Sequence, residues 1–187
     1  MGTINPVKPV LLFCAAFSAD EAAISWAKEK METQFGPVAL ESAPILFDEY
    51  TDYYTPSMGP HLVKKLWAFR NLIDPGQLPA IKCQTNDWED EYAHNHGYVL
   101  NGVQRPLNLD PGYVTLAKLI LASTKDHAHR IYLGDGIFAE TTLIYTKKTW
   151  TALPWTYPDY QSPGYHEFLY RCRELLKGDM EKFFCDK

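Results

Sequence analysis

Hydrophobic residues in the first part of the chain follow two different spacings. Val10–Phe17 is apolar without interruption, which is typical of a central strand covered by other elements. Apolar residues then recur at steps of three and four, which predicts an amphipathic helix that stops at Gly36 and Pro37. Ser18 and Glu21 have the spacing of a capping box, so Ser18 is the expected N-cap.

Residues 41–113 continue with strands and a second helix. Glu41–Tyr54 is expected to contain a strand that runs out into an acidic, tyrosine-rich segment. Leu62–Ile73 fits both the spacing of three and four residues of a helix and the alternation of a strand. The alternation of its bulky residues favours a strand. Asp74 is the expected N-cap of a helix with proline at its first position. Leu107–Tyr113 is predicted to be a fourth strand.

The last third of the chain has a different pattern. Val114–Ser123 fits either a helix or a strand. Arg130–Leu153 alternates like a β-meander, with one turn at Gly134–Gly136 and another near Lys147, because Asp-Gly and glycine-rich pairs accept the positive φ of tight turns. Tyr165–Phe184 is expected to close the chain as an amphipathic helix.

The order strand, helix, strand, strand, helix, strand is that of a ferredoxin-like sandwich, in which two helices cover one face of an antiparallel sheet. We therefore expect residues 1–187 to form a single α+β domain. Its core would span residues 8–113, and the meander and closing helix would span residues 114–187.

Composition narrows the functional classes. The formal net charge of -5 argues against sequence-independent binding of duplex nucleic acid, which requires surplus lysine and arginine. The four cysteines have no C-x-x-C spacing, which favours reduced thiols in a cytoplasmic protein. The apolar run that ends at Phe17 is too short to span a bilayer, so we expect no membrane association.

Polar residues in strand-like surroundings mark candidate chemistry. Asn108 and Asp110 share a strand face, and two short oxygen-bearing side chains at this spacing suit a cation, a sugar hydroxyl or a base edge. The alternative is that both residues satisfy backbone groups around Pro111 and Gly112.

The register of one hairpin decides the environment of Glu140. A three-residue loop, Gly134–Gly136, places Arg130 opposite Glu140 as a structural ion pair. A two-residue loop shifts the register by one and places Glu140 on the face of His129, whose imidazole the carboxylate could orient for proton transfer. Both registers remain open.

Several cationic and aromatic residues extend the candidate site. Lys118, Lys125, His129 and Arg130 could converge on an anion, with solvated surface charge as the alternative. The segment 154–160 could stack on a nucleobase or simply pack the meander. Two H-x-H pairs, at 94–96 and 127–129, raise a zinc site as a minor alternative.

The chain resembles the DUF4416 family of bacterial and archaeal proteins. The segments that carry the resemblance are NLDPGY at 108–113, STKD at 123–126, HRIYL at 129–133, GIFAETTL at 136–143 and LPWTYPDY at 153–160, with FD at 47–48, YY at 53–54 and NLIDP at 71–75. The resemblance implies no established activity. Some similar sequences carry a GTP-binding label, but this chain contains no G-x-x-x-x-G-K-[ST] motif.

These patterns favour a polar pocket for a phosphorylated or nucleotide-like small molecule, with Mg²⁺ as a candidate cofactor. The expected catalytic residues are Asp110, His129 and Glu140. The expected ligand-binding residues are Asn108, Tyr113, Lys118, Lys125, Arg130, Tyr157 and Asp159. The alternatives are a non-catalytic module that docks protein or single-stranded RNA on an aromatic sheet face, and a purely structural role for the polar motifs.

Overall fold

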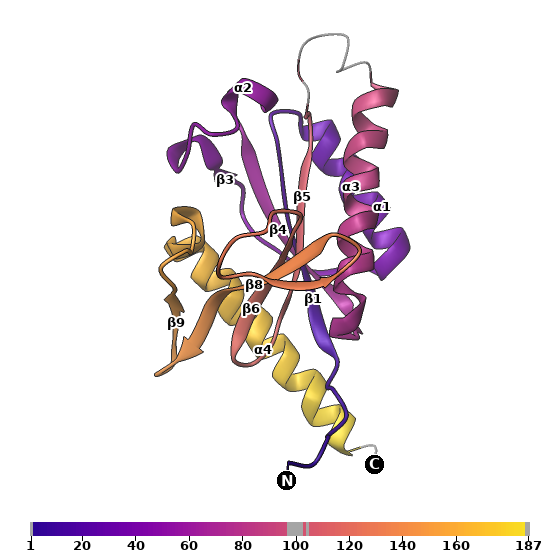
Figure 1. Cartoon of the computed structure of the whole chain (residues 1–187), viewed down its shortest axis with the longest axis vertical. Helices are drawn as coiled ribbons and strands as arrows, with labels where there is room; N and C mark the ends of the chain where they lie inside the picture. The colour runs from indigo at the N-terminus through magenta and orange to yellow at the C-terminus, as the bar shows by residue number, and fades with distance from the viewer. Residues whose placement is uncertain (1, 97–102, 104, 186–187) are drawn as a thin grey trace.

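The computed structural model describes residues 2–96, 103 and 105–185, and in that part of the chain it shows one nine-stranded antiparallel sheet with helices on both faces (Figure 1). The predicted α+β class is therefore confirmed. The sheet order is β2-β4-β1-β5-β6-β8-β7, while β3 pairs with β4 and β9 pairs with β8.

The first half of the chain contains the longest strands. Its elements are β1 (Val10–Ser18), α1 (Glu21–Phe35), β2 (Val38–Glu41), β3 (Ile45–Leu46), η1 (Phe47–Glu49), α2 (Thr55–Met58), β4 (Val63–Ile73), η2 (Pro75–Gln77), α3 (Leu78–Asn95) and β5 (Asn108–Val114). The predicted strand in Leu62–Ile73 is confirmed. The strand predicted in Glu41–Tyr54 is much shorter than expected: only β3, Ile45–Leu46, lies within that segment, because β2 ends at Glu41 and a 3-10 turn begins at Phe47.

The second half of the chain adds the meander and the last helix. Its elements are β6 (Lys118–Ser123), β7 (Ile131–Gly134), β8 (Ile137–Thr146), β9 (Thr149–Ala152), η4 (Pro158–Gln161) and α4 (Pro163–Cys185). The ambiguous segment Val114–Ser123 is thus a strand. The meander and its turn near Lys147 occur where they were predicted, and Lys147 and Lys148 both have positive φ.

Each face of the sheet has its own hydrophobic core. Residues of α1 and α3, including Met31 and Trp88, pack on one face around Leu12. Residues of α4, including Phe168, pack on the other face around Phe13. Figure 1 shows α1 and α3 side by side and α4 apart from them, so helices cover both faces of the central strands.

The N-terminus of α1 differs from the prediction. Asp20, not Ser18, is the N-cap, and its Oδ1 accepts from the Ala22 N–H at 2.9 Å. Ser18 instead accepts from the Asp20 N–H and donates to the Pro106 carbonyl. The hydroxyl of Ser18 therefore ties the end of β1 to the segment that precedes β5.

The β7–β8 hairpin combines both predicted registers. Gly134 pairs with Ile137 across the two-residue loop of Asp135 and Gly136, both with positive φ. A bulge at Leu133 then restores the other register, so Ile131 pairs with Ala139. Arg130, the next residue back, therefore comes opposite Glu140.

The sheet splits between β5 and β6. All seven residues of β5 pair with β1, but only Gly112–Val114 pair with β6, whereas β6 stays paired with β8 as far as Ser123. A Cβ at Gly112 would lie 2.1 Å from the Ile120 carbonyl oxygen, so glycine permits the close contact at this point. The two strands diverge on the N-terminal side of Gly112, where residues 108–111 of β5 have no partner in β6.

Candidate functional site

A cavity of about 760 Å³ lies where β5 and β6 diverge. The start of β5 and the end of β6 form two of its walls. Helix α3 and residues 47–54 and 157–160 form the others. The cavity is therefore built from segments that are far apart in the sequence.

Most of the predicted site residues line this cavity. They are Asn108, Asp110, Lys125, Arg130, Glu140, Tyr157 and Asp159. Three predicted residues do not line it. Lys118 is exposed at the opposite end of β6, Tyr113 packs into hydrophobic clusters, and His129 lies behind Glu140.

Glu140 is a buried carboxylate with several partners. Its Oε2 lies 2.7 Å from Arg130 Nε and 3.2 Å from His129 Nε2, and its Oε1 accepts from the Thr142 hydroxyl at 3.2 Å. The side chains of Glu140 and Arg130 are 3% and 5% exposed. This is a buried charge network and not the weak surface pair that an isolated hairpin would have.

His129 connects Glu140 to the outside of the cavity. Its ring stacks on Trp155, with centroids 4.7 Å apart and an interplanar angle of 11°. The Trp155 indole N–H donates to the Thr141 carbonyl at 2.8 Å, which fixes the indole against β8. The imidazole is therefore held in place by stacking on one side and by the carboxylate at its edge.

The guanidinium of Arg130 is only partly used by the protein. Its Nε binds Glu140, and its Nη1 donates to the Ser123 hydroxyl and to the Lys125 carbonyl. Its Nη2 donates to no residue in the described part of the chain. Lys125 Nζ has no carboxylate partner there either, and it lies 5.2 Å from the centroid of the Tyr53 ring.

The opposite wall of the cavity is a second charge network. Lys82 donates to the Leu109 carbonyl at 2.6 Å and lies 4.0 Å from Glu89. Glu89 accepts from the Leu109 N–H at 2.7 Å and from Arg105 at 3.3 Å. Arg105 also donates to the Asn108 side-chain oxygen. Burial raises the pKa of Glu89, and Lys82 lowers it by less.

Asp110 differs from the buried carboxylates Glu89, Glu140 and Asp159 of the cavity wall. Its Oδ1 lies 3.5 Å from Lys82 Nζ, and its side chain is 28% exposed. Its Oδ2 accepts no hydrogen bond from the residues that the structure describes. Asp110 therefore presents an open acceptor to the cavity.

Lys64 and Asp159 form a third buried pair. Their Nζ and Oδ2 atoms are 2.7 Å apart, and both side chains are 3% exposed. The ammonium lies 3.8 Å from the centroid of the Phe47 ring and 5.3 Å from that of Tyr160. The pair joins β4 to η4.

Tyrosines form much of the remaining wall. They are Tyr50, Tyr53, Tyr54, Tyr157 and Tyr160. Burial raises the pKa of Tyr54, and the charge of Asp110 raises it further. Tyr54 therefore remains a protonated phenol at neutral pH and can donate a hydrogen bond.

The sequence interpretation did not identify Lys64, Lys82, Glu89 or Arg105. Lys82, Asn86 and Glu89 recur at steps of four and three, so a polar stripe on α3 could have been recognised beside its apolar stripe. Lys64 had no such signal, because it is followed by a second lysine and only the structure shows that it points inward.

The two histidine pairs contact other groups in this structure. His94 and His96 bond to carbonyls of their own helix, and His127 stacks near His129 with centroids 5.9 Å apart. Among the side chains that the structure describes, no group of three or more His, Cys, Asp or Glu is placed to hold a metal ion.

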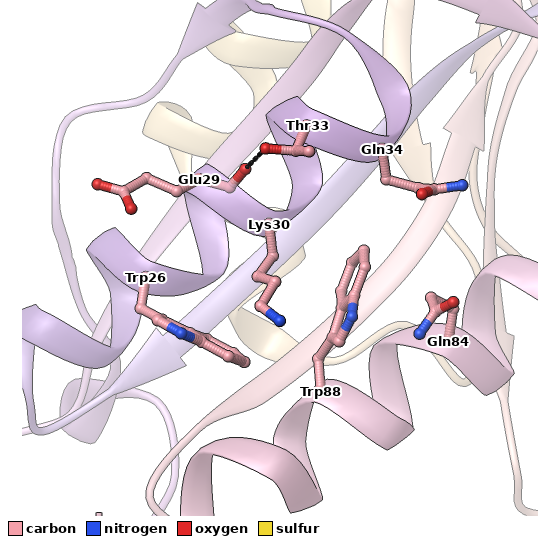
Figure 2. A pocket seen from close by; sticks show the side chains of 7 residues that line it. All are labelled: Trp26, Glu29, Lys30, Thr33, Gln34, Gln84 and Trp88. Carbon is pink, nitrogen blue, oxygen red and sulfur yellow. Dashed lines mark hydrogen bonds between the residues drawn. The ribbon is translucent and has the colours of Figure 1, made fainter. Parts of the chain in front are cut away.

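A second, smaller pocket of about 430 Å³ lies between α1 and α3. Figure 2 shows the Lys30 side chain between the indoles of Trp26 and Trp88. Lys30 is already paired with Glu91 at 2.8 Å. The pocket holds none of the predicted site residues, so the larger cavity is the better candidate.

Every helix in the described part of the chain is too short or too polar to span a bilayer. A family model described as Domain of unknown function (DUF4416) matches residues 8–176 of the 187. This match confirms the resemblance seen in the sequence motifs. No curated protein and no solved structure matches the chain.

Proposed function

We propose that this chain, which belongs to the DUF4416 family, binds a phosphorylated or nucleotide-like small molecule in the cavity between β5 and β6. The observation that carries the proposal is an imbalance among the polar groups of the wall. The buried carboxylates already have cationic partners, whereas Lys125 Nζ and Arg130 Nη2 have no anionic partner among the described residues.

An anion is the ligand that this imbalance favours. Lys125 and Arg130 are joined through the Lys125 carbonyl, so the two cations belong to one local structure. Arginine binds phosphate oxygens with directed N–H groups and lysine adds a mobile charge. His127, which also lines the cavity, adds a third potential donor on the same side.

The tyrosine-rich wall supports a ligand with a ring. Tyr53 and Tyr54 contact each other edge to face, with centroids 5.0 Å apart, and Tyr54 also contacts Phe17. Tyr157 is 52% exposed, which leaves its ring accessible. Aromatic side chains of this kind stack on nucleobases or on the apolar face of sugars.

Turnover is part of the proposal. Glu140 and His129 would move a proton between the cavity and solvent, because Glu140 lines the cavity and the His129 side chain is 22% exposed. Asp110 would accept a hydrogen bond or a proton from the ligand at Oδ2, the oxygen that Lys82 does not contact. Mg²⁺ is a candidate cofactor, since it commonly joins phosphates to one or two carboxylates.

The strand order supports a ferredoxin-like arrangement for the first half of the chain. The sequence β1, α1, β2, β4, α3, β5 is placed in the order β2-β4-β1-β5, with α1 and α3 on one face. A cytoplasmic location fits a chain whose described cysteines are all free thiols. The alternative of a docking module has less support, because helices cover both faces of the central sheet.

A thermal-shift screen tests the proposal. The probes are orthophosphate, sugar phosphates and nucleoside phosphates, each with and without Mg²⁺. A bound ligand at 100 times its Kd adds about 2.7 kcal/mol of stability, which raises the Tm by several degrees at this size. We expect Lys125→Ala to abolish the shift. The matched control is Lys118→Ala, which removes a lysine of β6 outside the cavity.

The two variants make the outcome interpretable. Both lysines are exposed, so neither substitution should change stability in the absence of ligand by more than about 0.5 kcal/mol. No shift with any phosphate compound would contradict the proposal. An equal shift in Lys125→Ala and Lys118→Ala would place the binding site elsewhere.

A further inference from the structure

We infer that the ligand has two chemically different ends: a phosphate bound by Lys125 and Arg130, and a hydrogen-bond donor bound by Asp110. This inference rests on the proposed function and deepens it by naming the ligand class. That class is phosphate esters that also carry a hydroxyl or ring N–H group. A bare phosphate, or a phosphate ester without a donor, would use only half of the site.

The evidence is the state of the carboxylates around the cavity. Asp159 is bound to Lys64 at 2.7 Å, and Glu140 has partners at both oxygens. Glu89 also has partners at both oxygens, the Leu109 N–H and Arg105. Asp110 is the one of these four whose side chain accepts no hydrogen bond from the described part of the chain, since its contact with Lys82 is an ion pair at 3.5 Å. Its side chain is also the most exposed, at 28%, against 12% for Glu89 and 3% for Glu140 and Asp159.

The position of Asp110 is fixed before any ligand arrives. Its own strand β5 is paired with β1 along its whole length. Lys82 Nζ lies 3.5 Å from Oδ1, and the Leu109 carbonyl at 2.6 Å holds that ammonium in turn. Lys82 thus engages Oδ1, while Oδ2 accepts no hydrogen bond from the described residues and the side chain lines the cavity. A carboxylate held in this way is an acceptor that selects ligands with a donor.

The two ends of the site lie on different walls. Asp110 belongs to β5, whereas Lys125 and Arg130 follow β6, and the strands have diverged at this level. A ligand that engages both must bridge the split in the sheet. The 760 Å³ volume accommodates a phosphorylated sugar or a nucleotide.

The experiment uses NMR titrations of the full chain with three probes. Methyl phosphate has the anion and no donor group besides any phosphate proton. Ribose 5-phosphate adds hydroxyls. Dideoxyuridine 5′-monophosphate adds a ring N–H but has no sugar hydroxyl. The variants are Asp110→Ala and the isosteric Asp110→Asn, and the control is Asp135→Asn in the hairpin turn, where asparagine tolerates the positive φ.

We expect Asp110→Ala to weaken the binding of a donor-bearing probe without weakening the binding of methyl phosphate. For at least one of the two donor-bearing probes the Kd should rise about tenfold, since a hydrogen bond to a charged group is lost. The Kd of methyl phosphate should stay the same or fall, because a negative charge has left the site. Asp110→Asn should show the same pattern more weakly, and Asp135→Asn should match the wild type.

The source of the donor follows from which probe responds. A response confined to ribose 5-phosphate identifies a sugar hydroxyl, and one confined to the dideoxynucleotide identifies a base N–H. If methyl phosphate binds in a Lys125-dependent way and both larger probes ignore Asp110, the inference is overturned while the proposed function stands. If no probe binds, or if Lys125→Ala binds every probe normally, the proposed function itself fails.

Discussion

Two buried ion pairs border the cavity, and they differ in how much support each receives. Lys64–Asp159 and Arg130–Glu140 have the same N–O distance of 2.7 Å and similar burial. Lys64 has one carboxylate partner and otherwise aromatic rings around it. Arg130 and Glu140 each have further hydrogen-bond partners. Although the two pairs are about equally buried, we expect them to differ in how much stability the protein loses when one partner is removed.

The largest expected effect is the loss of Lys64. Lys64→Ala leaves the Asp159 carboxylate buried without its cation, and breaking a buried pair from one side costs about 3–5 kcal/mol. Urea denaturation measures this loss. The neighbouring Lys65→Ala is the control, because its pair with Glu41 is partly exposed and contributes no more than about 1 kcal/mol.

A double variant sharpens this test. Lys64→Met with Asp159→Leu removes both charges and keeps apolar side chains of similar length among the aromatic rings. We expect it to recover most of the stability lost in Lys64→Ala. A double variant as unstable as the single one would mean that the pair itself, and not the unpaired charge, sets the stability of this wall.

A smaller effect is expected for the networked pair. Glu140→Gln keeps an oxygen that can accept from Arg130, and Arg130 retains Ser123 and the Lys125 carbonyl, so the loss should be about 1–3 kcal/mol. The same change leaves the charge of Arg130 uncompensated, so the Kd for orthophosphate should fall. Denaturation and phosphate titration measure the two effects. A loss as large as that of Lys64→Ala would remove the difference between the pairs.

The smallest effect is expected at Glu89, where a backbone N–H and two cations share one carboxylate. Burial raises its pKa, so the folded chain binds this proton more tightly than the unfolded chain does. Stability must then fall as the pH rises from the usual carboxyl pKa through the raised one. The Tm of the wild type relative to Glu89→Gln should therefore decrease with pH across that interval. A difference that is constant or increases with pH would contradict this assignment.

The periodic parts of the fold were predictable from the sequence, and the contacts that build the cavity were not. Local spacing identified the strand at Val10, the helices α1 and α3, and the meander, but not the short helix α2. The hairpin register depended on a bulge at Leu133, which no local signal marks. The N-cap of α1 shifted to Asp20 because Ser18 bonds to Pro106, a residue distant in sequence.

The residues that the strands contribute to the candidate site were predictable, and the charged residues that helix α3 contributes were not. Glu140 and Asp110 are charged residues within strands and Arg130 directly precedes one, which is an unusual position for such side chains. Lys82 and Glu89 lie on a helix, where charged residues at any one face are common and usually solvated. Their burial results from the packing of α3 against β5, which is a tertiary contact.

The glycine at which β5 and β6 diverge allows the size of the cavity and its selectivity to vary separately. Because Gly112 sets where the two strands touch, the dimensions of the cavity depend on backbone geometry. The side chains that would contact the proposed ligand, such as Asp110 and Lys125, come from strands and loops on the side where the two strands have separated. Substitutions at those positions would change the ligand specificity during evolution and leave the backbone that encloses the cavity unchanged.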